Sequence, residues 1–123
     1  MYGQLVQRFK NMELAIDLTL DIYRTTATLP KIELYGLVSQ LRRASVSIAS
    51  NIAEGKGRSS DREFILFLHH ARGSLLEVET QLLIAGELKY VDVVEGKRLQ
   101  EKIDNLGKSL NALINSLKSV QAA

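Results

Sequence analysis

Cysteine is absent from this 123-residue sequence. Its absence excludes a disulfide framework, a thiolate metal site and a cysteine nucleophile. A chain without cysteine is compatible with a reducing compartment, and we expect a cytoplasmic protein. The two histidines, His69 and His70, are adjacent, so on a helix their rings point about 100° apart and do not easily share one metal ion. The Glu-x-x-His pattern of a di-iron bundle is also missing, and we predict no metal and no cofactor.

Proline and long apolar runs are scarce as well. Pro30 is the single proline, and this scarcity favours long uninterrupted helices. No run approaches the ~18 apolar residues that a membrane span needs. The opening stretch MYGQLVQRFKNMELAIDL lacks the continuous apolar segment of a signal peptide. We therefore expect no membrane segment and no signal peptide, and the length predicts one domain, residues 1–123.

The motifs of common enzyme active sites are missing too. The stretch GKGRSSD resembles part of a phosphate-binding loop, but it lacks the spacing GxxxxGK[ST] and the strand that precedes it. The serines belong to no histidine–acid arrangement that the sequence reveals. The composition, with 46% hydrophobic and 24% charged residues and a net charge of +2, is ordinary for a globular protein. We predict that the protein is not an enzyme.

Helical periodicity is what the sequence does contain. The first helix is predicted from about Leu5 to Ala27, because apolar residues recur every three or four positions. Its main apolar face is predicted to consist of Leu5, Phe9, Met12, Ile16, Leu20 and Tyr23. Further apolar residues widen that face, namely Ala15, Leu18 and Ile22.

The second helix is predicted to follow a break at residues 28–31, which Pro30 favours because proline disfavours helix at the residue before it. It should begin at Ile32 or Glu33 and end at Glu54. Gly55 and Gly57 follow, and glycine readily adopts the left-handed conformation that a helix C-terminus needs.

Two more helices are predicted, each opened by a capping signal and each carrying a heptad seam. Ser60 with Glu63 opens the third helix, and Asp92 with Glu95 opens the fourth. The third seam consists of Phe64, Leu68, Ala71, Leu75, Val78, Leu82 and Ala85. The fourth consists of Leu99, Ile103, Leu106, Leu110, Leu113, Leu117 and Val120. Four amphipathic helices with short connections predict an all-α, antiparallel, up-down-up-down four-helix bundle.

Some apolar residues remain outside the seams that close such a bundle. Exposed apolar patches usually mark an interface, so we predict a homo-oligomer. The alternative is that these residues thicken the core of a monomer. The set consists of Leu18, Ile22, Ile65, Leu66, Leu76 and Leu83.

A row of small and polar residues lies beside the apolar face of the second helix. It consists of Ala44, Ser47, Asn51 and Glu54. One interpretation is tight helix packing with a solvated edge. The other is a buried polar seam, formed by Ser47, Asn51 and Glu54, that fixes the register of the helices or lines a channel.

Cations gather around the predicted turn between the second and third helices. Lys56 and Arg58 lie on the turn, and a helix N-terminus beside them favours anions. We predict that these side chains contact the phosphates of RNA or DNA without reading the base sequence. The alternative is an ordinary solvated turn. The candidate residues are Arg42, Arg43, Lys56, Arg58, Arg62 and Arg72.

Two motifs resemble those of a known family. SIxxNIAEGxGR matches Ser47–Arg58, and AxGSLLExET matches Ala71–Thr80. They resemble the small bacterial four-helix-bundle family named after intervening sequences in 23S ribosomal RNA genes, and the likeness covers nearly the whole chain. That family is similar to the accessory variability protein of diversity-generating retroelements, a basic pentameric barrel that associates with a reverse transcriptase and nucleic acid. The resemblance implies a four-helix bundle, a homopentamer and no established enzymatic activity.

Three functional hypotheses follow. The first is a non-enzymatic oligomeric bundle that contacts RNA or DNA, or a nucleoprotein partner, through phosphate. The second is a structural or protein-interaction module in which the cations only maintain solubility. The third is a ligand-binding or catalytic bundle. Salt dependence separates the first two, because phosphate binding weakens steeply as salt is added.

Overall fold

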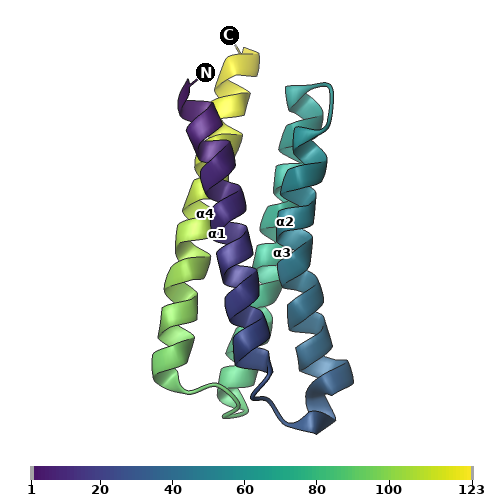
Figure 1. The fold of residues 1–123 in the computed structure, drawn as a ribbon. Coiled ribbons are helices and arrows are strands. Elements are labelled where there is room, and N and C mark those ends of the chain that lie inside the picture. The colour runs from purple at the N-terminus through teal and green to yellow at the C-terminus, as the bar shows by residue number, and fades with distance from the viewer. Residues whose placement is uncertain (1, 123) are drawn as a thin grey trace.

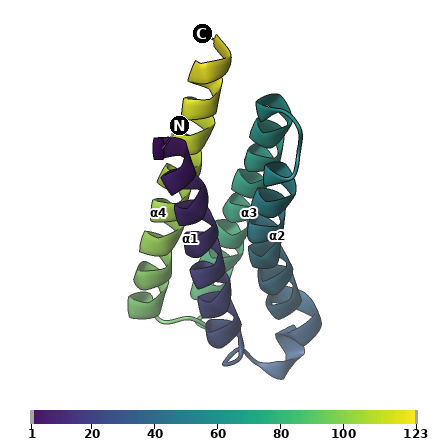
Figure 2. The same ribbon diagram turned by 45° about the horizontal axis from the view of Figure 1, so that its top comes forward.

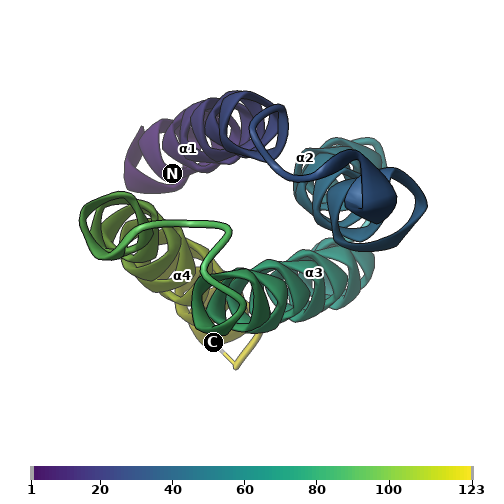
Figure 3. The ribbon, with the colours of Figure 1, turned by 90° about the horizontal axis from the view of Figure 1, so that it is seen from below.

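The computed structural model describes residues 2–122, and it describes the side chains of all of these except 2, 4–8 and 122. Within that range the chain forms four long helices and no strand: α1 (Tyr2–Thr26), α2 (Ser39–Lys56), α3 (Asp61–Glu87) and α4 (Val93–Ala122). Successive helices run in opposite directions (Figure 1). Viewed along the bundle, they form a ring in which α1 also neighbours α4 (Figure 3). The predicted all-α four-helix bundle is confirmed.

The α1–α2 connection differs from the prediction. A 3₁₀ turn (Lys31–Glu33) and a π-helical turn (Leu34–Val38) precede α2, which begins at Ser39 instead of at Ile32 or Glu33. Gly36 has non-helical backbone angles (φ −110°, ψ −113°) and interrupts the helix there. The Glu33 side chain accepts a hydrogen bond from the Leu37 N–H (3.3 Å) and another from the Tyr90 hydroxyl (3.1 Å), so it ties this segment to the α3–α4 connection.

The buried face of α1 is also different from the predicted one. Phe9, Ile16, Leu20 and Tyr23 are exposed, and the side chain of Leu5 lies outside the described ones. The residues predicted only to widen the face form the buried one instead, together with three polar residues. These buried residues are Asn11, Ala15, Leu18, Asp21, Ile22 and Thr26. Both sets recur every three or four positions, so periodicity alone does not decide which set meets the other helices.

The seams of α3 and α4 are largely confirmed. Leu75 is 3% exposed and Leu110 is fully buried, and they share one core with residues of α1 and α2. Leu82 is half-buried and Val120 is exposed. Of the residues predicted to remain outside the core, Leu18, Ile22 and Ile65 are buried, whereas Leu66, Leu76 and Leu83 are exposed. The prediction was therefore wrong for the first three and right for the last three.

Both predicted N-terminal caps are present. The Glu63 N–H donates to the Ser60 hydroxyl at the start of α3 (3.2 Å), and the Glu95 N–H donates to Asp92 Oδ1 at the start of α4 (2.8 Å). Each bond satisfies a backbone donor that a helix start leaves without an intrahelical acceptor.

The C-terminal ends of the helices correct the role assigned to glycine. No glycine between residues 2 and 122 has a positive φ, and Gly57 has φ −78°. Gly55 is buried inside α2, where an added Cβ would lie 2.7 Å from Phe64 Cδ1 and 2.9 Å from Phe67 Cβ. Its missing side chain therefore allows α3 to approach. Among residues 2–122, the residue with a positive φ is Lys89, which follows α3 (φ 66°).

No helix in the described part of the chain combines the length and the apolarity needed to cross a membrane.

Candidate nucleic-acid interface and polar contacts between helices

The six predicted phosphate ligands do not form one cluster. Arg42 and Arg43 lie near the start of α2, whereas Lys56, Arg58 and Arg62 lie around the α2–α3 turn. With a rise of about 1.5 Å per residue, the two groups are roughly 20 Å apart along the helix. Figures 1 and 2 place the turn at the same end of the bundle as the beginning of α1 and the end of α4. We call Lys56, Arg58 and Arg62 the turn group.

The members of the turn group differ in their contacts. Lys56 Nζ lies 5.3 Å from the centre of the Phe9 ring. Arg58 pairs with Glu54 at 2.8 Å and lies 4.7 Å above the ring of Phe67. Arg62 is exposed and has no hydrogen bond or ion pair with any side chain that the structure describes.

Arg42 and Arg72 link neighbouring helices instead. Arg42 Nε donates to Thr26 Oγ1 (2.9 Å), and its guanidinium lies 4.7 Å above the Tyr23 ring, which joins α2 to α1. Arg72 Nη1 donates to Asn111 Oδ1 (2.8 Å), which joins α3 to α4. Arg43 lines a hollow of about 340 Å³ between α2 and α3. These three arginines are therefore separate from the turn group.

Arg72 also forms a hydrogen bond with His69, on its own helix. Because arginine only donates, His69 Nδ1 accepts the hydrogen bond from Arg72 Nη2 (3.0 Å). Burial lowers the pKa of His69, and the nearby charges of Arg72, Lys118 and His70 lower it further. His69 is half-buried and His70 is exposed. No group of three or more His, Cys, Asp and Glu among the described residues could hold a metal ion.

The row of polar residues on α2 is divided by the fold. The Ser47 and Ser74 hydroxyls are 2.9 Å apart, and Asn51 Nδ2 donates to the Ser47 carbonyl (2.9 Å). Ala44 is buried beside them. Glu54 is exposed and pairs with Arg58. Ser47 therefore lies at the α2–α3 contact, Asn51 bonds back to Ser47 within α2, and Glu54 faces solvent.

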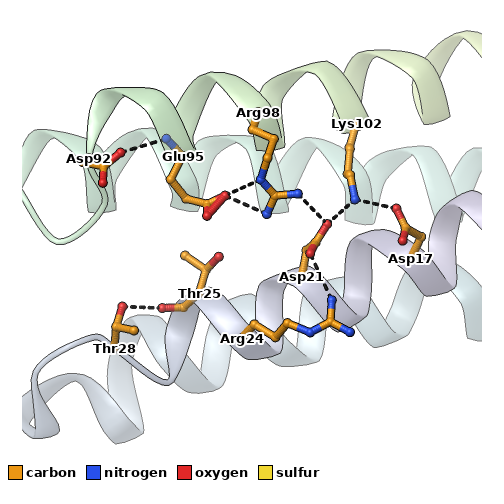
Figure 4. A network of polar contacts seen from close by, with 9 residues as sticks. All are labelled: Asp17, Asp21, Arg24, Thr25, Thr28, Asp92, Glu95, Arg98 and Lys102. Atoms are coloured by element: carbon orange, nitrogen blue, oxygen red, sulfur yellow. Dashed lines mark hydrogen bonds and ion pairs between the residues drawn. The ribbon is translucent and has the colours of Figure 1, made fainter.

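Sequence reasoning missed the largest polar network, which lies between α1 and α4 (Figure 4). Asp21, whose side chain is only 7% exposed, pairs with Arg24 and Arg98 at 3.2 Å each and with Lys102. Lys102 also pairs with Asp17 at 2.7 Å. A signal was available in the sequence, because Asp17 and Asp21 share the four-residue spacing of Arg98 and Lys102. Side chains four residues apart lie on the same side of a helix.

The charges of this network stabilise one another. Burial alone raises the pKa of Asp21, but the hydrogen bonds from Lys102 and Arg98, together with their charges, lower its pKa overall. Hydrogen bonds to Asp17 and Asp21 raise the pKa of Lys102. The carboxylate of Asp21 is thus engaged by cations, and the arrangement joins two helices.

Comparison with known proteins identifies the family. The sequence model of the 23S rRNA-intervening sequence proteins matches residues 7–112. The chain belongs to this family. A structure of an S23 ribosomal protein family member from Bacteroides thetaiotaomicron, described as a protein with unknown function, is similar in fold, with a TM-score of 0.82 and 19% identity. The similarity covers 89% of this chain and 98% of the other. No functionally curated protein matches.

In this member of the 23S rRNA-intervening sequence protein family, charge is distributed unevenly along the bundle. The half that contains the α2–α3 turn consists of residues 2–14, 48–74 and 107–122, and it carries eight Lys and Arg against four Asp and Glu. The other half, residues 15–47 and 75–106, carries eight against ten. The turn half therefore has a net charge of +4 and the other half −2.

Proposed function

We propose that the protein is a non-enzymatic homo-oligomeric bundle that contacts RNA or DNA through phosphate at the end holding the α2–α3 turn. The observation that carries this proposal is the net positive charge of that half of the bundle. A polyanion is attracted to the positive end of a protein whose charge is unevenly distributed. In the other half carboxylates outnumber cations, and three of its cations, Arg24, Arg98 and Lys102, pair with Asp21.

The turn group supplies the contacts. Arg62 is exposed and available. Arg58 is 41% exposed and its partner Glu54 is 57% exposed, and an ion pair so open to water contributes little, so a phosphate displaces Glu54 at small cost. The N-terminus of α3 contributes less to phosphate binding than the sequence suggested. Ser60 already caps it, and its first turn carries Asp61 and Glu63, which repel phosphate.

Titration with mixed RNA and DNA at low salt tests this proposal. Each of Lys56→Ala, Arg58→Ala and Arg62→Ala should weaken binding and reduce the slope of log affinity against log salt by about 1. Lys97→Ala is the matched control, because Lys97 is an exposed lysine in the other half. A parent protein that fails to bind at low salt, or turn variants that bind as tightly as the parent, would refute phosphate contact.

The homo-oligomer is proposed from the exposed apolar side chains. Ile16 and Leu20 on α1 are 47% and 49% exposed, and Leu76 and Leu83 on α3 are 56% and 63% exposed. Covering such surfaces with another copy removes them from water. Five subunits follow from the family resemblance alone. Light scattering during size-exclusion chromatography should give a pentamer mass, and Leu83→Asp should lower it. A monomer mass at micromolar concentration would refute assembly.

A structural or protein-interaction module is the second candidate, and the same exposed apolar side chains favour it. It predicts an oligomer that binds neither RNA nor DNA at any salt concentration. A pull-down from the native cell, analysed for both RNA and protein, separates direct nucleic-acid contact from contact with a nucleoprotein partner.

A further inference from the structure

Two aromatic rings lie beside the cations of the turn. Phe9 from α1 is 61% exposed and has Lys56 Nζ 5.3 Å from its centre. Phe67 from α3 is half-buried and has the Arg58 guanidinium 4.7 Å above it. Lys56 ends α2 and Arg58 lies two residues further along the chain, so the two rings flank the same end of α2.

His70 extends the aromatic surface on α3. It is exposed, and its ring centre lies 5.7 Å from that of Phe67, with the planes at 73°. The linear sequence separates Phe9 from Phe67 by more than 50 positions, and no aromatic residue stands between Lys56 and Arg62. Only the packing of α1 and α3 against α2 interleaves aromatic rings with the turn cations.

Aromatic rings that lie next to cations suit a strand whose bases are not paired. A base stacks on an exposed aromatic ring, while a cation beside the ring meets the neighbouring phosphate. The bases of a duplex are stacked on one another, so they offer no free faces to the protein. A protein that contacts only phosphates binds paired and unpaired strands with affinities that differ only through the charge density of the strand.

We infer that the turn end binds single-stranded nucleic acid, with bases stacked on Phe9 and on the Phe67–His70 surface while Lys56 and Arg58 contact phosphates. This inference rests on the proposed phosphate contact and adds the class of strand to it. The Phe9 ring lies beside Lys56 and the Phe67 ring lies beside Arg58 at the end of α2, and the strand passes over both. Binding depends on base faces and is independent of base sequence, because every base has such a face.

Fluorescence anisotropy with four labelled oligonucleotides of about 12 nucleotides, within the usual site sizes of such proteins, tests the inference. The probes are oligo-rU, oligo-dT, a duplex and an abasic DNA strand with the same number of phosphates. Oligo-rU or oligo-dT should bind more tightly than the duplex and the abasic strand. The relative affinities of the first two show whether RNA or DNA is preferred.

Variants of the rings locate the stacking. Phe9→Leu should weaken binding of the unpaired strand roughly fivefold to a hundredfold and leave the abasic strand unaffected. Phe67→Leu should act alike, with a thermal melt recorded because Phe67 is half-buried. Tyr23→Leu is the matched control, since Tyr23 also lies beneath an arginine but at the opposite end. Its affinity should equal that of the parent.

The outcomes of these experiments distinguish base stacking from the proposed phosphate contact. Equal affinity for the unpaired and abasic strands, or tighter binding of the duplex than of the unpaired strands, overturns stacking and leaves phosphate contact standing. Binding to none of them at low salt overturns both. If Phe9→Leu lowers the mass of the assembly and leaves the affinity for the unpaired strand unchanged, the Phe9 ring is part of a contact between copies, and stacking on it is refuted.

Discussion

The α2–α3 contact and the α1–α4 contact join helices by different means. Between α2 and α3, the missing side chain of Gly55 allows close approach, and the hydroxyls of Ser47 and Ser74 meet at 2.9 Å. Between α1 and α4, the carboxylate of Asp21 is held by Lys102 and by cations on either side. The first contact is neutral and depends on shape, whereas the second depends on charge.

The difference determines how each contact responds to its surroundings. Close packing of small residues is insensitive to ionic strength, and overfilling it costs free energy. Ion pairs whose cations remain partly exposed weaken with salt and with protonation of the carboxylate. Both contacts rest on the same leucine-rich core, so stability measurements on variants can compare them on one scale.

Removing a core leucine should lower the free energy of unfolding the most, and it provides the reference for the other variants. Leu75→Ala on α3 and Leu110→Ala on α4 should each lower the free energy of unfolding by roughly 2–5 kcal/mol, because each leaves a cavity. Leu76→Ala is the control, since Leu76 is 56% exposed, and it should change stability much less. Thermal melts of the two core variants that coincide with the parent would show that the helix faces are wrong.

Breaking the charged contact should come next. Asp21→Asn leaves Arg98 and Lys102 without their shared carboxylate, and the expected loss is about 1.5–3 kcal/mol, as for hydrogen bonds to charged groups. Chemical denaturation at low and at high salt measures it, and the loss should shrink as salt increases. A loss of the same size at both salt concentrations would contradict a charge-dependent contact.

The pH dependence of this variant sharpens the comparison. The pKa of Asp21 is lowered in the folded protein, so its contribution is complete above the unfolded pKa and is lost as pH falls through the lower, folded value. The gap in stability between the parent and Asp21→Asn should therefore narrow below about pH 4. Ser74→Ala, which alters the neutral contact, should show a gap that does not change with pH.

Overfilling the neutral contact should have the smallest destabilising effect of the three. Gly55→Ala places a Cβ 2.7 Å from Phe64 Cδ1, and overpacking of this kind costs about 1–3 kcal/mol. Gly73→Ala is the matched control, because an added Cβ there meets no atom within 4 Å. It should stabilise α3 by up to about 1 kcal/mol through helix propensity. Equal effects of the two substitutions on the melting temperature would contradict a close approach at Gly55.

Predictions from the sequence were correct where a residue type in its local pattern can form only one kind of structure. Ser60 and Asp92 cap helices because their side chains bond to backbone N–H groups that lie nearby in the chain. Predictions failed where one sequence pattern is compatible with two different structures. Leu18 and Leu20 both lie on apolar faces of α1, and only the positions of α2 and α4 decide that Leu18 is the buried one. Gly55 likewise fits both a helix end and a close contact.

Some features of the candidate site were likewise predictable from the sequence and others were not. The cations of the α2–α3 turn could be identified from the sequence because they are close together along the chain. That Arg42 instead binds Thr26, and that Phe9 lies beside Lys56, could not be predicted, because these contacts join residues far apart in the sequence. By itself the sequence determined the four helices, their caps and the family, since these depend on local periodicity, nearby backbone bonds and motifs. The tertiary structure decided which faces are buried, which charges are paired and which rings meet the cations, because each depends on how neighbouring helices are rotated about their own axes.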